Sequence, residues 1–182
     1  MEQPLSVSET IRIENENFFF PRSMELSLLK NCPEVIPVLA EWLYNEWHSY
    51  DTSLTKEKLV SAFQSRLNAD VIPITFVVLK NSLPIGLISL KQEKDPEFRD
   101  FPKDSIWMGS LQVAPEERMQ GIGEELLKFS QSVAKQFGCE TLYFYTSNPT
   151  NVKWYCNRGA QIIEKRPFRD HEITVMQISL ND

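Results

Sequence analysis

The sequence is poor in the residues that build disulfide frameworks and metal sites. Its 182 residues include three cysteines, Cys32, Cys139 and Cys156, with neither a CxxC pair nor metal-ligand spacing. Only two histidines are present, which excludes a histidine-rich metal site, and we expect no bound metal. A sparse, odd number of cysteines is typical of a reducing compartment, so the sequence predicts a cytoplasmic protein.

Long hydrophobic runs are absent as well. No stretch approaches the ~20 apolar residues of a transmembrane helix, and the N-terminus lacks the basic start and long apolar middle of a signal peptide. Its apolar cluster at residues 18–20 ends at Pro21. We interpret residues 1–22 as an N-terminal extension that packs onto the domain or onto a neighbouring chain. Residues 23–182 are enough for one well-buried domain.

The sequence has fewer positively charged residues than negatively charged ones. Nineteen Lys and Arg residues against 25 Asp and Glu residues give a formal net charge of −6. This balance argues against nucleic acid or an anionic membrane surface as the main partner, and it slightly favours a cationic one. The sequence also has no internal repeat at a fixed period and no low-complexity segment.

Alternating helical and strand periodicities make up the rest of the chain. The expected order is β-α-α-β-β-β-α-β-α-β-β, which predicts an α/β or α+β fold with one mixed sheet and helices on both faces. The expected strands are 24–29, 74–80, 85–92, 106–113, 141–146, 160–165 and 173–180. The expected helices lie in 33–50, 54–67, 124–137 and 148–159.

The strand at 106–113 leads into the motif R-M-Q-G-I-G, at residues 118–123, where a helix begins. The P-loop template fails because glutamate follows Gly123, and the dinucleotide fingerprint fails because Leu126 replaces its third glycine. A plain strand-to-helix turn is one interpretation. The other is an anion site, in which Gly121 admits a ligand to the free N–H groups of the helix start and Arg118 adds positive charge. These residues alone leave both interpretations open.

Two motifs together resemble one family. Residues 113–127, V-A-P-E-E-R-M-Q-G-I-G-E-E-L-L, resemble the acetyl-CoA loop of the GNAT superfamily of N-acetyltransferases, with its [QR]-x-x-G-x-[GA] signature. A second family segment, N-x-x-x-x-x-[FW]-Y before a glycine, matches Asn148, Trp154, Tyr155 and Gly159. The element order is also that of the family over roughly residues 23–182. The resemblance implies a mostly antiparallel central sheet that is splayed between its fourth and fifth strands.

The resemblance also implies roles for individual residues. Main-chain groups of Leu111 and Val113 would bind the pantetheine arm of acetyl-CoA, and an N–H of Val113 or its neighbour would stabilise the oxyanion. Asn148 would hydrogen-bond the pantetheine, and Tyr155 would protonate the departing thiolate. The backbone amides that would bind the pyrophosphate belong to Arg118, Met119, Gln120, Gly121, Ile122, Gly123 and Glu124.

The sequence departs from the family pattern in three places. Four glutamates surround the single arginine of the loop, which is expected to weaken binding of the cofactor phosphates; they are Glu116, Glu117, Glu124 and Glu125. The strand at 106–113 has no carboxylate, so the glutamate that some relatives use as general base is missing. Ala160 replaces the usual aromatic residue after Gly159.

The acceptor side is less defined by the sequence. Trp47, His48 and Tyr50 could line an acceptor pocket, as the resemblance implies for this region, or pack as core residues. We expect His171 to cap a hairpin turn. The amine would lose its proton through ordered water, relayed by Glu41, Glu46 or Asp104.

The resulting hypothesis is an N-acetyltransferase that uses acetyl-CoA and acts on a primary amine in a ternary complex. The acceptor is a small molecule or a protein N-terminus, and a homodimer is left open. The alternative is a non-catalytic module of GNAT-like fold that senses acyl-CoA without transferring the acyl group.

Overall fold

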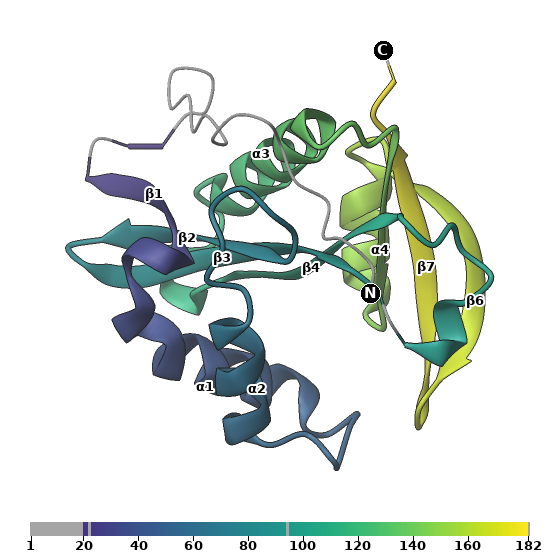
Figure 1. Ribbon diagram of the computed structural model, residues 1–182, viewed down its shortest axis with the longest axis horizontal. Coiled ribbons are helices and arrows are strands. Elements are labelled where there is room, and N and C mark those ends of the chain that lie inside the picture. Colours follow the sequence, from purple (N-terminus) through teal and green to yellow (C-terminus); the bar gives the residue numbers. More distant parts are fainter. Residues whose placement is uncertain (1–19, 22, 94, 182) are drawn as a thin grey trace.

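One sheet forms the middle layer of the molecule, with helices on both of its faces (Figure 1). The computed structural model describes residues 20–21, 23–93 and 95–181. Within them the strand order is β1-β2-β3-β4-β5-β7-β6. The strands are β1 (Met24–Leu28), β2 (Ile74–Lys80), β3 (Leu83–Gln92), β4 (Ile106–Val113), β5 (Thr141–Thr146), β6 (Gln161–Phe168) and β7 (His171–Ser179).

Neighbouring strands are antiparallel throughout, apart from the parallel pair β4 and β5. The mixed, mostly antiparallel sheet confirms the expected fold class. The helices are α1 (Ile36–Trp47), α2 (Lys56–Gln64), α3 (Ile122–Gln136) and α4 (Pro149–Cys156). Short 3-10 turns occupy Leu29–Asn31, Pro33–Val35, Pro96–Phe98 and Pro115–Glu117. In the described part of the chain, no helix is long and apolar enough to cross a membrane.

Strand alternation divides the core between the two faces of the sheet. Phe76 and Ile88 face α3 and belong to the larger apolar cluster, whereas Val77 and Leu87, their chain neighbours, pack under α1 and α2. A third cluster forms around Phe98 where the 95–105 loop covers β4 and β5. The central strands β2 and β3 are therefore buried and apolar on both faces, whereas the edge strand β6 is largely exposed.

The expected extension, residues 1–22, lies almost wholly outside the described residues. Of its described residues, Phe20 packs against the larger apolar cluster.

Candidate active site

Two connected cavities flank β4. The larger one has a volume of about 740 Å³ and lies between β4, the 117–124 loop, β5 and α4. The smaller one, of about 380 Å³, lies between α1, α2, β4 and the β6–β7 turn. We call them the cleft and the side cavity. Their common wall consists of Leu43, Trp47, Met108, Gly109, Ser110 and Tyr145.

The cleft exists because β4 and β5 separate. They pair only at Ile106 with Leu142 and at Trp107 with Tyr143. Beyond that point β4 carries a β-bulge, and Ser110 in it has a positive φ of 58°. A bulge bends its strand and increases the local twist, so the C-terminal halves of β4 and β5 diverge. This is the splay that the family resemblance implies between the fourth and fifth strands.

Backbone conformation prepares the loop before α3 for a ligand. Gly121 has a φ of +82°, a left-handed conformation that glycine adopts without strain, and no side chain caps the helix that follows it. The first helical hydrogen bonds, from Glu124 N and Glu125 N, go to the Gly121 carbonyl. The N–H groups of Ile122 and Gly123 therefore lie ahead of the helical ladder, where the helix dipole favours an anion.

The acidic residues of this loop are largely neutralised. Glu117 pairs with Lys80 at 2.6 Å, and this ion pair lowers the pKa of the Glu117 carboxyl. Glu124 contacts Lys128 at 3.1 Å and Arg158 at 2.9 Å, and these two cations, Lys128 first, lower its pKa. Glu125 also pairs with Lys128, at 3.0 Å. The crowding expected from the sequence is thus offset by Lys128, one turn further along α3, and by Lys80 and Arg158, which lie far from the motif in the chain.

Most of the residues assigned to cofactor binding line the cleft. They are Leu111, Val113, Arg118, Met119, Gly121, Ile122, Gly123, Glu124 and Asn148, and Tyr155 joins them. Gln120 is exposed, donates to Glu117 at 3.0 Å and does not line the cleft. Arg118 Nε donates to the Val113 carbonyl at 3.0 Å, which leaves one lone pair of this carbonyl for a ligand.

Asn148 and Tyr155 are fixed by α4. The Asn148 side-chain oxygen caps the helix by accepting from Thr150 N at 2.9 Å, so its NH₂ group is the part left to donate to a ligand. Tyr155 is buried, with its ring centroid 4.5 Å from that of Phe144. Burial raises the pKa of the Tyr155 hydroxyl above its ordinary value. A tyrosine in this position is a protonated donor at neutral pH.

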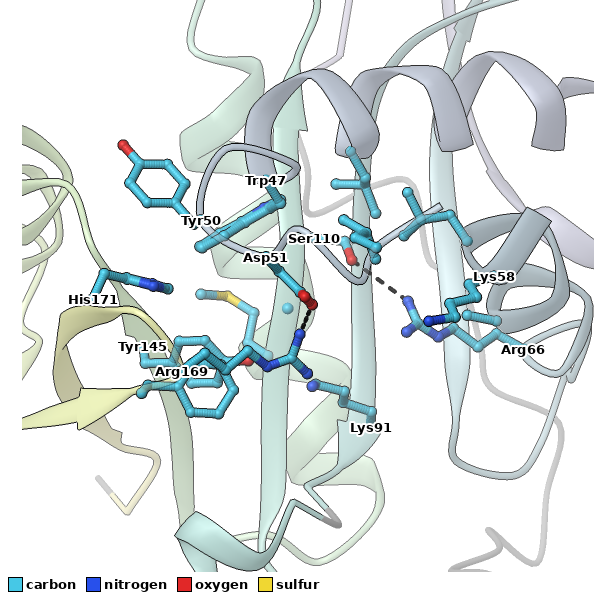
Figure 2. Close-up of a pocket in the computed structure, with 17 residues that line it drawn as sticks. Trp47, Tyr50, Asp51, Lys58, Arg66, Lys91, Ser110, Tyr145, Arg169 and His171 are labelled. Atoms are coloured by element: carbon cyan, nitrogen blue, oxygen red, sulfur yellow. Dashed lines mark hydrogen bonds and ion pairs between the residues drawn. The ribbon is translucent and has the colours of Figure 1, made fainter. Parts of the chain in front are cut away.

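Of the three aromatic residues expected on the acceptor side, two line a cavity and one does not. Trp47 and Tyr50 line the side cavity (Figure 2). His48 is exposed, stacks on Tyr44 at 4.7 Å and lines neither cavity. Among the three expected proton relays, Glu46 lines the cleft, whereas Glu41 pairs with Lys56 outside it. The third, Asp104, is exposed and lines neither cavity.

Sequence reasoning missed the polar residues of the side cavity. His171 begins β7, and Figure 2 shows its ring pointing into the cavity. Both ring nitrogens are buried and lack a hydrogen-bond partner among the described residues. Five charged residues also line the cavity, namely Asp51, Lys58, Arg66, Lys91 and Arg169. They come from separate segments and form no motif, so no local pattern could have assembled them. Residues 20–21, 23–93 and 95–181 contain no group of three or more potential metal ligands.

Comparison with known proteins gives the following matches. The model of the acetyltransferase (GNAT) family matches residues 36–159. No curated protein matches the sequence. Among solved structures, aminoglycoside 6'-acetyltransferase type Ii is 16% identical with a TM-score of 0.66, over 87% of this chain and 98% of that one.

Two further solved structures are similar. The yncA protein of Salmonella typhimurium, solved with its cofactor acetyl-CoA, is 16% identical with a TM-score of 0.64, over 88% of this chain and 96% of that one. A spermidine N-acetyltransferase chimera from Vibrio cholerae and hSSAT is 19% identical with a TM-score of 0.61, over 87% and 96%. At these identities the likeness is one of fold.

Proposed function

This chain belongs to the GNAT family of acetyltransferases, and from that premise we propose that it transfers the acetyl group of acetyl-CoA to a small-molecule primary amine. The observation that carries the proposal is the pair of cavities on either side of β4. One has the free helix N–H groups that suit phosphates, and the other opens onto the same strand from the opposite face. A direct transfer needs both ligands to meet at such a wall.

The residues of the cleft suit the cofactor. The loop at 118–124 would hold the pyrophosphate. Arg158, stacked 4.0 Å from the Trp154 ring, pairs with Glu124 and so offsets the repulsion between that carboxylate and the phosphates. The edge of β4 that faces away from β3, with the Val113 carbonyl on it, suits the amide groups of the pantetheine arm. The names of relatives support the cofactor, because yncA was solved with acetyl-CoA.

The reaction then follows from the arrangement. The amine nitrogen attacks the thioester carbonyl carbon, a C–N bond forms, and the C–S bond breaks. The leaving thiolate takes the proton of the Tyr155 hydroxyl, which the apolar surroundings keep protonated. The amine gives up its proton through ordered water to Glu46, which lines the cleft, or to His171, which lines the side cavity, and a proton from solvent then restores the Tyr155 hydroxyl. No covalent enzyme intermediate is required.

The names of similar structures also support a small acceptor. They include acetyltransferases of aminoglycosides and of spermidine, which are small-molecule amines. The volume of the side cavity, about 380 Å³, is near the lower end of the ~300–1,000 Å³ range of small-molecule sites.

The test is turnover across a panel of amines and peptide N-termini, followed by release of the coenzyme A thiol and by mass of the acetylated product. We expect acetylation of small amines at rates above acetyl-CoA hydrolysis. Acetyl-CoA binding without transfer to any acceptor would instead favour the non-catalytic sensor, and a preference for peptides would move the acceptor class to protein N-termini.

A further inference from the structure

The side cavity is positively charged, unlike the molecule as a whole. Its lining includes four cationic side chains and one carboxylate, in a chain whose net charge is −6. Two of the cations are compensated, because Arg169 pairs with Asp51 and Lys91 pairs with Glu93. Lys58 donates to the Ser53 carbonyl, an uncharged partner. Arg66 is the fourth.

Arg66 has no anionic partner within ion-pair distance among the described residues. Its Nη1 reaches two hydroxyl groups, Ser89 Oγ at 3.3 Å and Ser110 Oγ at 3.5 Å. The Ser89 hydroxyl is already bonded to Thr75 Oγ1 at 2.7 Å. Burial lowers the pKa of the guanidinium, and Glu93 acts on it only through its electrostatic field. Because an arginine stays charged at neutral pH, this is a partly buried cation that lacks a counter-ion.

The position of Arg66 relates it to the reaction. It follows α2 in the chain, and Figure 2 shows its guanidinium pointing into the side cavity, toward Ser110. Ser110 belongs to the wall that the cavity shares with the cleft. His171 lies on the other side of the cavity in the same view. An anionic group bound at Arg66 would thus anchor one end of a small ligand whose other end can approach β4.

We propose that the acceptor is a primary amine that also carries a carboxylate, and that Arg66 binds this carboxylate. The inference rests on the proposed function and specifies its substrate class. A guanidinium offers two parallel N–H donors that match a carboxylate, and the Ser110 hydroxyl and Lys58 ammonium line the same cavity. A polyamine would meet two uncompensated positive charges instead, which disfavours it.

Matched pairs of acceptors test the proposal. Each α- or ω-amino acid is compared with its primary amide and with the amine that lacks the carboxyl group. We expect kcat/KM to be roughly 10- to 100-fold higher for the acid, the range for a hydrogen bond to a charged group. The ammonium of an α-amide is more acidic than that of the amino acid, so more of the amide is present as free amine at neutral pH. Amine reactivity alone would therefore favour the amide and cannot explain a preference for the acid.

The Arg66→Met variant keeps the unbranched apolar part of the side chain and removes the charged guanidinium. The acid should lose its 10- to 100-fold advantage, mainly through KM, because the carboxylate is held equally before and during the reaction. Arg169→Met is the matched control, since Arg169 lines the same cavity but already pairs with Asp51. That variant should keep the preference for acids. The rise in Tm with acetyl-CoA shows in both variants whether fold and cleft are intact.

The outcomes separate the two proposals. Amides or polyamines acetylated as efficiently as the acids would overturn the carboxylate class and leave the acetyltransferase standing. Equal losses on acid and amide in Arg66→Met would remove Arg66 from carboxylate recognition. A protein that acetylates neither member of any pair, yet is stabilised by acetyl-CoA, contradicts the proposed function and the inference with it.

Discussion

Tyr155 joins the chemistry of the proposed reaction to the packing of the core. Tyr155 lines the cleft, and it is also a member of the larger apolar cluster. Tyr155→Phe keeps the ring and removes only the proton donor, so the fold and the affinity for acetyl-CoA should change little. A general acid contributes ~10²–10⁴-fold, and kcat should fall by about 10²-fold because water can partly replace the hydroxyl in an open cleft. Single-turnover rates measure the chemical step without interference from product release. An unchanged rate would make Tyr155 a packing residue.

The pH dependence of this step follows from the direction of the Tyr155 shift. An acid catalyst works only while protonated, and a raised pKa moves the loss of its proton above the ordinary value of 10.0. The kcat of the parent enzyme should therefore show no alkaline decline from Tyr155 up to pH 10. A kcat profile recorded up to that pH, with stability followed in parallel, checks this. A decline between pH 7 and 9 that Tyr155→Phe abolishes would contradict it.

If the amine loses its proton through water, neither of two single variants should lose much activity. Glu46→Gln and His171→Asn each remove one possible relay and leave the water path to the other. Each should lower kcat/KM by less than the ~10²-fold that is the minimum for a dedicated general base. The kcat/KM profile against pH in each variant is the measurement. A larger loss in one variant, together with loss of the acidic limb of its profile, would identify a single base.

At the scale of elements, the turn before α3 offers an internal control. Gly121 and Gly138 both have positive φ, 82° and 75°, and a Cβ at either position would meet no atom within 4 Å. Gly121 lines the cleft and Gly138 lines neither cavity. Valine should cost each position at least the ~1–2 kcal/mol of a left-handed side-chain residue. Only Gly121→Val should also lose the rise in Tm with acetyl-CoA, because its side chain occupies the phosphate position. Equal stabilisation of Gly121→Val and the parent would show that the loop does not bind the cofactor.

How much of this could be read from the sequence depends on how local each signal is. The order of the elements and the loop at 118–123 were predictable, because periodicity and the glycine motif are confined to short segments. The pairing of Glu124 with Arg158 joins residues 34 positions apart, and no local pattern contains it. The side cavity is harder to predict, since Arg66 and His171 are 105 positions apart in the chain (171 − 66). Tertiary packing brings them together, and only the fold reveals it.

At the scale of the whole molecule, the sheet consists of two halves. One half contains β1, β2, β3 and β4, and the other contains β5, β7 and β6. Only two residue pairs between β4 and β5 join them. A ligand that contacts both halves should stabilise the native state. At 100 times its Kd, acetyl-CoA adds about 2.7 kcal/mol, which for a chain of this size corresponds to a rise in Tm of about 5–11 °C. Hydrogen exchange should slow most in residues 108–124 and 144–158, which flank the cleft. Protection confined to other segments would place the cofactor elsewhere.

The wall shared by the two cavities has a thermodynamic consequence. Ser110, with its positive φ, is in contact with both spaces, so its position cannot change for one ligand without changing the site of the other. Occupancy of the cleft and of the side cavity is then linked. If bound acetyl-CoA changes the affinity for the acceptor by some factor, bound acceptor must change the affinity for acetyl-CoA by the same factor. The cellular level of either compound would set how much of the other the protein holds.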